Sequence, residues 1–210
     1  MARTRSSAVT RAVRRAGARL VWLFTGYRFA PSKAPDEPTI FVGAPHTSNT
    51  DFFLMLAIAW ELDVRIKFLI KDSWLRGPFS GLIRALGGVA VDRGDPAGLV
   101  DQLLGGMRAG TVSHLVVTPE GTRGGGSGYW KSGFYRIAQA AGMPVTLGYV
   151  DGDRRVAGLG PSLRMTGDVR ADMDRIRAFY ADKSGVRPEN RVEPRLRAED
   201  PPGEHPAAAA

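Results

Sequence analysis

The chain has 210 residues, of which 43% are hydrophobic, and a formal net charge of +8. This length suits one domain with arms better than two domains, and the apolar fraction is ample for a core. The chain has no cysteine, which excludes a disulfide framework, a cysteine-based metal site and a thiol nucleophile.

The charge excess lies in an N-terminal arm, residues 1–33, which holds 8 of the 29 lysines and arginines and no acidic residue. The arm has apolar side chains at helical spacing on one face and arginines on the other, which predicts a basic amphipathic helix. We expect residues 1–28 to contact anionic lipid at a membrane surface. Packing on the protein's own core is the alternative, and no nucleic-acid partner is expected. The apolar face comprises Val9, Val13, Ala16, Leu20, Leu23, Phe24 and Tyr27, and the basic face Arg11, Arg14, Arg15 and Arg19.

Past the arm, short apolar runs alternate with helical stretches, a pattern typical of α/β folds with parallel sheets. Residues 34–185 are therefore expected to form a single α/β domain, with a mostly parallel mixed sheet flanked by helices. Residues 186–210 are rich in proline and charge and are expected to be loosely ordered. Strands are predicted at 38–44, 64–70, 87–92, 113–118 and 143–150, and helices at 51–62, 77–87, 96–110, 133–142 and 168–185.

His46 and Asp51 lie in the loop between the first predicted strand and the first predicted helix of this domain. In an extended strand their side chains would be about 16 Å apart, so they meet only if the chain turns between them. Residues 47–50 are all good helix N-cap types, which favours such a turn. Asp51 could then accept the imidazole N–H and fix the tautomer of His46. Alternatively, His46 is an ordinary loop residue and Asp51 only caps the helix.

Arginines follow two further buried strands, Arg93 after the strand at 87–92 and Arg123 within the run 119–123, Pro-Glu-Gly-Thr-Arg. A guanidinium can bind a phosphate through two hydrogen bonds, and glycine lets backbone N–H groups approach the same anion. Taken alone, each arginine could equally be an ordinary surface residue.

The chain resembles the glycerolipid acyltransferases, the lysophosphatidate acyltransferase-like group, over residues 40–150. Four motifs carry the resemblance in the family's order: His-x4-Asp, then GGVAVDR, PEGTR and MPVTLGYV. The phrase YWKSGFYRIA, which begins at Tyr129, resembles a small bacterial subgroup. The resemblance implies transfer of a fatty acyl group from a thioester, acyl-CoA or acyl carrier protein, to a hydroxyl of a lysophospholipid-like acceptor such as 1-acyl-glycerol-3-phosphate. No cofactor and no metal are expected.

The resemblance also implies roles for individual residues. His46 would be the catalytic base and Asp51 would orient it. Lys131 is a possible contact for the donor or a phosphate, or else simply a lysine at a helix start. The implied phosphate-binding residues are Arg93, Glu120, Gly121, Thr122 and Arg123.

Thr50 and Ala90 stand where many members of the family have an aromatic residue, which weakens the choice of lysophosphatidate as acceptor. Two other classes remain open: a thioesterase that uses the same His–Asp pair on water, and a non-enzymatic membrane-binding protein. The expected location is the cytoplasmic side of the cell membrane, as a peripheral protein, because no apolar run approaches the roughly 18–20 residues of a transmembrane helix.

Overall fold

A seven-stranded sheet in the order β1-β7-β6-β2-β5-β3-β4 forms the centre of the computed structural model, which describes residues 7–91, 101, 104–106, 108, 109, 114–121 and 128–200. All neighbouring strands run parallel except β6 and β7, so the predicted mostly parallel α/β fold is confirmed. The strands are β1 (Arg28–Phe29), β2 (Thr39–Ala44), β3 (Lys67–Lys71), β4 (Gly88–Val91), β5 (His114–Val117), β6 (Val145–Asp151) and β7 (Val156–Leu163).

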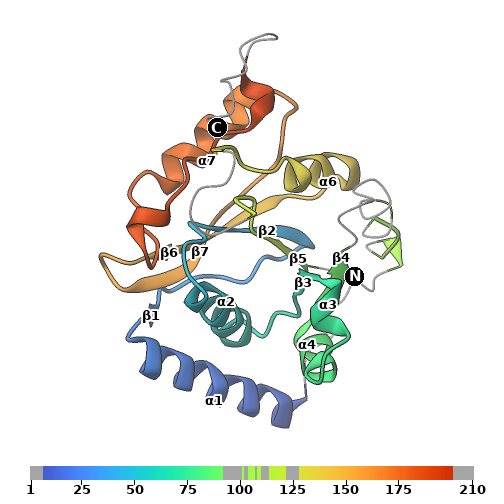
Figure 1. Cartoon of the computed structure of the whole chain (residues 1–210), viewed down its shortest axis with the longest axis vertical. Helices are drawn as coiled ribbons and strands as arrows, with labels where there is room; N and C mark the ends of the chain where they lie inside the picture. The colour runs from blue at the N-terminus through green and yellow to red at the C-terminus, as the bar shows by residue number, and fades with distance from the viewer. Residues whose placement is uncertain are drawn as a thin grey trace.

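Helices cover both faces of the sheet (Figure 1). On one face α2 (Thr50–Glu61) packs against the strands, and α1 (Ala8–Thr25) lies outside it. On the other face lie α6 (Gly133–Ala141) and α7 (Val169–Tyr180). The shorter helices are α3 (Asp72–Leu75), α4 (Ser80–Leu86) and the two 3-10 turns η1 (Pro188–Asn190) and η2 (Arg197–Glu199).

Each face of the sheet has its own apolar core. Under α6 and α7, Phe134, Ile176 and Tyr180 pack against the inward side chains of β2 and β6. Under α2, Leu56 and Phe68 belong to a second buried cluster. Parallel strands covered on both faces read as nearly continuous apolar runs. This burial explains why apolar runs in the sequence predicted β2, β5 and β6.

The antiparallel strand β7 was not predicted. Its sequence, VAGLGPSL, contains two glycines and a proline, which are poor strand residues. The ring of Phe179 packs against Gly160, where a Cβ atom would come within 2.2 Å of it. The glycine that weakens the strand pattern therefore makes room for an aromatic residue of α7.

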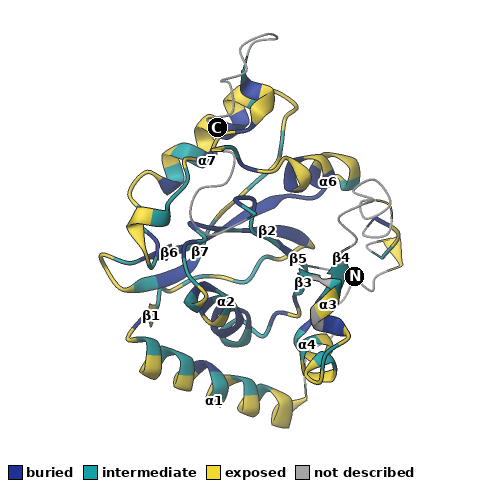
Figure 2. Ribbon diagram, viewed as in Figure 1, coloured by how far each residue is buried: buried dark blue, intermediate teal, exposed yellow. Residues whose placement is uncertain are grey.

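Helix α1 presents two different faces (Figure 2). The predicted apolar face is exposed to solvent, with Leu23 at 74% and Phe24 at 83% relative exposure, except for Tyr27, which follows the helix and is buried at 5%. The opposite face packs on α2: Ala18 is fully buried, and a Cβ atom at Gly17 would come within 2.8 Å of the Trp60 ring. The intramolecular packing considered as the alternative thus occurs, but it uses the other side of the helix.

One ion pair and one further hydrogen bond support the packed face of α1. Arg14 pairs with Asp63 at 3.2 Å, and the Trp22 indole donates to Glu61 at 3.2 Å. Arg14 was expected on a free basic face, and this expectation is corrected by its contact with the end of α2. None of the described helices is long and apolar enough to span a membrane.

The C-terminal segment, defined here as residues 186–200, packs on the domain. Leu196 is 1% exposed and forms a parallel β-bridge with Trp130. The expectation of a loosely ordered segment is therefore corrected as far as residue 200, because single buried apolar residues anchor a stretch whose overall composition is polar. Residues 201–210 lie outside the described residues, as does most of the helix predicted at 96–110.

Candidate active site

A cavity of about 1430 Å³ opens beyond the carboxyl ends of β2 and β5. Ligand sites of open α/β sheets gather at this edge. The loop that follows β2 carries His46, and the loop that follows β5 carries Thr118, Glu120 and Gly121. Two loops singled out in the sequence thus meet in one place.

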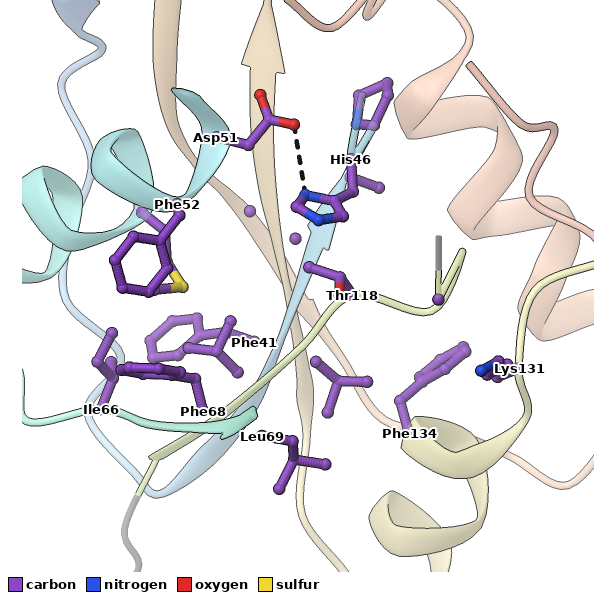
Figure 3. Close-up of a pocket in the computed structure, with 18 of the residues that line it drawn as sticks. Phe41, His46, Asp51, Phe52, Ile66, Phe68, Leu69, Thr118, Lys131 and Phe134 are labelled. Atoms are coloured by element: carbon purple, nitrogen blue, oxygen red, sulfur yellow. Dashed lines mark ion pairs between the residues drawn. The ribbon is translucent and has the colours of Figure 1, made fainter. Parts of the chain in front are cut away.

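His46 and Asp51 are neighbours, with His46 Nδ1 lying 3.3 Å from Asp51 Oδ2 (Figure 3). Both side chains are largely buried, with 13% and 7% of their area exposed. The loop turns back because Asp51 Oδ2 also accepts the backbone N–H groups of Thr47 at 2.6 Å and Ser48 at 2.8 Å. Asp51 therefore both shapes the loop and faces the imidazole. This contact leaves Nε2 as the nitrogen that can accept a proton.

Thr47 connects this loop to the C-terminal segment. Its hydroxyl oxygen accepts the backbone N–H of Arg187 at 3.0 Å, and its carbonyl accepts the side-chain amide of Asn190 at 3.1 Å. Gly185, at φ +75°, leaves room for Thr47, since a Cβ atom there would come within 2.9 Å of it. Sequence reasoning missed Thr47 and Asn190, because no motif links residues that lie 143 positions apart.

Glu120 lies beneath the His46 loop, 5% exposed, and its Oε2 accepts the His46 backbone N–H at 2.8 Å. Burial raises the pKa of Glu120 to about 7, the Asp51 charge adds to this shift, and the hydrogen bond from His46 opposes it. The resemblance implied a phosphate-binding role for Glu120. In the structure its carboxylate is buried and turned toward the His46 backbone, and the phosphate-binding role stays a prediction.

Gly121 follows Glu120 with φ +76°, and the Lys131 side chain lies across it. A Cβ atom at Gly121 would come within 2.6 Å of Lys131 Cε, which the flexible lysine could relieve, but the positive φ itself strains any other side chain and favours glycine. Lys131 lines the cavity beside Phe134, on the side away from Phe41, Phe52 and Phe68. The predicted phosphate-binding residues Arg93, Thr122 and Arg123 lie outside the described residues.

His46 lies between two unlike ends of the cavity (Figure 3). On one side of it are apolar side chains, among them Phe41, Phe52 and Phe68. On the other side lies Lys131, beside the ring of Phe134. Arg136 and Arg197 also line the cavity. The cavity can therefore hold a molecule with an apolar chain at one end and a charged group at the other.

A family model described as Acyltransferase matches residues 9–147, well over half of the chain. The chain belongs to the acyltransferase family. The resemblance to glycerolipid acyltransferases and the prediction of an acyltransferase enzyme are thereby confirmed. A comparison with curated proteins finds no match for this acyltransferase.

Among solved structures, the acyltransferase is similar to PlsC, the 1-acyl-sn-glycerophosphate (LPA) acyltransferase of Thermotoga maritima. The two share 19% sequence identity and a TM-score of 0.56, and the likeness covers 80% of this chain and 76% of PlsC. At this identity the comparison supports the fold. No group of three or more histidine, aspartate or glutamate residues with the geometry of a metal site occurs in the described part of the acyltransferase.

Proposed function

We propose that the chain transfers a fatty acyl group from a thioester donor, acyl-CoA or acyl carrier protein, to a hydroxyl of a lysophospholipid-like acceptor. The observation that carries the proposal is the 3.3 Å contact between His46 and Asp51 inside a largely apolar cavity. A thioester is already activated, so the reaction needs a base and positioning rather than a covalent enzyme intermediate.

In the proposed reaction His46 acts as the general base. Its Nδ1–H faces Asp51, and Nε2 takes the proton of the acceptor hydroxyl as the hydroxyl oxygen attacks the thioester carbonyl carbon. The carbon–sulfur bond then breaks, and the departing thiolate takes the proton back from His46. The products are an ester and a free thiol, and the imidazole returns to its starting state.

The size of the cavity supports a lipid substrate. Its volume of about 1430 Å³ exceeds the roughly 300–1,000 Å³ of ordinary small-molecule pockets. The aromatic and aliphatic lining on one side of His46 can cover an acyl chain, since each buried CH2 group contributes about 0.8 kcal/mol. We propose 1-acyl-glycerol-3-phosphate as the acceptor, supported by the family and by the fold shared with the Thermotoga enzyme.

Acceptor dependence tests the proposal against a thioesterase with the same His–Asp pair. We would incubate the purified protein with acyl-CoA alone, and then with 1-acyl-glycerol-3-phosphate, other lysolipids or polyols, and follow free thiol and acylated product by mass spectrometry. A transferase releases thiol at a rate that depends on the acceptor and forms an ester in equal amount. Steady thiol release that no acceptor changes, with free fatty acid as the product, would instead establish a hydrolase.

We also propose that α1 brings the protein to anionic membranes as a peripheral protein of the cytoplasmic face. Support comes from the outer face of α1, where Val9, Val13, Leu20, Leu23 and Phe24 are exposed, flanked by the exposed arginines 15 and 19. Such a helix inserts apolar side chains while its arginines attract anionic headgroups. The absence of cysteine is compatible with a reducing compartment.

Introducing negative charge at apolar positions of this outer face tests the membrane proposal and leaves the packed face intact. The variant Leu20→Glu/Leu23→Glu should no longer sediment with liposomes that contain anionic lipid, whereas wild type sediments less as salt is raised. The control Gln139→Glu/Ala140→Glu adds the same charge on exposed positions of α6, across the sheet, and should sediment as wild type does. Equal sedimentation of all three proteins would place any membrane contact elsewhere.

A further inference from the structure

A short pairing of two distant segments contributes Tyr129, Trp130, Lys131 and Arg197 to the lining of the cavity. Trp130 pairs with Leu196 in a parallel bridge, and the backbone N–H of Trp130 donates to the Arg195 carbonyl at 2.7 Å. Trp130 and Leu196 are both buried. Because side chains alternate along extended chains, the residues on either side of each face the other way. Tyr129, Lys131, Arg195 and Arg197 are accordingly partly or fully exposed.

Lys131, Arg136 and Arg197 all line the cavity, and we call these three the cationic rim. Their side chains make no ion pair or hydrogen bond within the parts of the chain that the structure describes. Arg195 differs, because it is paired with Asp200. The rim therefore concentrates three uncompensated positive charges in a domain that, outside the arm, has 21 basic and 21 acidic residues.

The rim is held in place from behind. The Tyr129 ring contacts two guanidinium groups, 5.7 Å from Arg195 and 5.5 Å from Arg197, and its hydroxyl donates to Asp200 at 2.5 Å. Cation–π contacts of this kind fix the direction of an arginine without neutralising it. Arg197 is thus oriented but keeps its charge for a ligand.

Two further contacts fix the segment that carries Arg197. Glu199 accepts the Leu196 N–H at 2.6 Å and Arg177 Nη1 at 2.7 Å. On the other side of the bridge, the Lys131 N–H donates to the Pro119 carbonyl at 2.7 Å. Lys131 is thereby tied to the loop that carries Glu120, whose carboxylate in turn contacts the His46 backbone. The rim and the His46 loop therefore belong to one connected framework.

We propose that the cationic rim binds a phosphate group of one of the two substrates, in addition to any contact made by the Pro-Glu-Gly-Thr-Arg loop. The proposal rests on the proposed acyl transfer. An acyl thioester of CoA and a 1-acyl-glycerol-3-phosphate share one layout, in which an acyl chain, a reacting centre and a phosphate follow in that order. The cavity offers matching parts: Phe41, Phe52 and Phe68 lie on one side of His46 and Lys131 on the other, and Arg136 and Arg197 also line it.

The chemistry of the rim suits phosphate. Arginine can hold a phosphate through two parallel N–H donors, and lysine contributes a compact positive charge. Each rim residue is exposed, so each alone contributes little, and the affinity depends on their convergence on one anion.

Binding to the purified full-length protein tests the rim without any need for turnover. The variant Arg136→Gln/Arg197→Gln is compared with wild type and with Arg65→Gln, which removes an exposed arginine that does not line the cavity. The probes are CoA and a short-chain 1-acyl-glycerol-3-phosphate, each matched with its phosphate-free counterpart, pantetheine and the monoacylglycerol. Calorimetry gives the dissociation constants, and the two single variants serve if the double variant does not fold.

The rim predicts about tenfold weaker binding of a phosphate-bearing probe to the double variant, with the phosphate-free counterparts and Arg65→Gln unchanged. A loss confined to CoA assigns the rim to the donor, and a loss confined to 1-acyl-glycerol-3-phosphate assigns it to the acceptor. Three results would overturn the proposal that the rim binds phosphate. They are unchanged binding of both phosphate-bearing probes to the double variant, an equal loss of affinity for the phosphate-free probes, and a wild type that binds neither phosphate-bearing probe. Absence of acyl transfer by wild type would instead refute the proposed function and leave these binding results standing.

Discussion

The two ends of the cavity are built in opposite ways. At the His46 end, backbone and side-chain hydrogen bonds from three separate segments fix a buried loop: Asp51 from α2, Glu120 from the loop after β5 and Asn190 from η1. At the rim the cations are exposed, and the Tyr129 ring orients Arg197 without neutralising it. A proton-transfer group must be positioned before the substrate arrives, because small errors in geometry cost large factors in rate. A site for a charged headgroup also needs concentrated positive charge that solvent and ligand can reach.

Removing the imidazole should give the largest effect and tests whether the fixed end is the chemical one. His46→Ala is expected to lower kcat by about 10²–10⁴, the usual contribution of a general base. Asp51→Asn should lower it less, because the imidazole remains. Steady-state kinetics on proteins shown to be folded by circular dichroism measure both. Near-normal turnover by folded His46→Ala would show that His46 is not the general base and that the fixed end of the cavity is not where proton transfer occurs.

Burial of the Glu120 carboxyl beside the His46 loop should make the free energy of unfolding depend on pH. Because its folded pKa of about 7 lies above the ordinary 4.5, its contribution to stability is fully present below pH 4.5 and is lost as pH rises through 7. The loss amounts to about 3 kcal/mol in the free energy of unfolding. Urea unfolding at several pH values compares wild type with Glu120→Gln, which keeps an oxygen for the His46 N–H. Parallel pH profiles for the two proteins would contradict the assignment.

Asn190 should contribute a smaller effect, through position rather than contact with substrate. Asn190→Asp has the same shape but lacks the amide donor to the Thr47 carbonyl, so kcat should fall about tenfold with KM nearly unchanged. Asn190→Gln, which keeps a donor, should recover part of the loss, and Glu189→Gln on the same turn is the control. A change in KM alone would mean that this segment binds substrate instead.

The sequence predicted the parts of the molecule that depend on neighbours along the chain. The five-residue spacing and the polar run predicted a turn between His46 and Asp51, although Asp51 itself closes the turn and the N-cap Asn49 makes no side-chain capping bond. Apolar runs predicted the buried parallel strands. Contacts between distant segments left no such pattern. The Asn190–Thr47 bond and the Trp130–Leu196 bridge each depend on residues that look ordinary in their own surroundings. Amphipathicity found the outer face of α1, whereas the close contact of the packed face with α2 depends on the small residues Gly17 and Ala18, which give little apolar signal.

The bonds from Arg187 and Asn190 to Thr47 also bear on when the enzyme becomes active during its own synthesis. Thr47 leaves the ribosome about 140 residues before its partners. At ~5–20 residues per second, the His46 loop waits on the order of ten seconds for them. A nascent chain can therefore build much of its sheet while the loop still lacks these two bonds. We expect chains that stop before residue 185 to fold much of the domain and transfer acyl groups poorly.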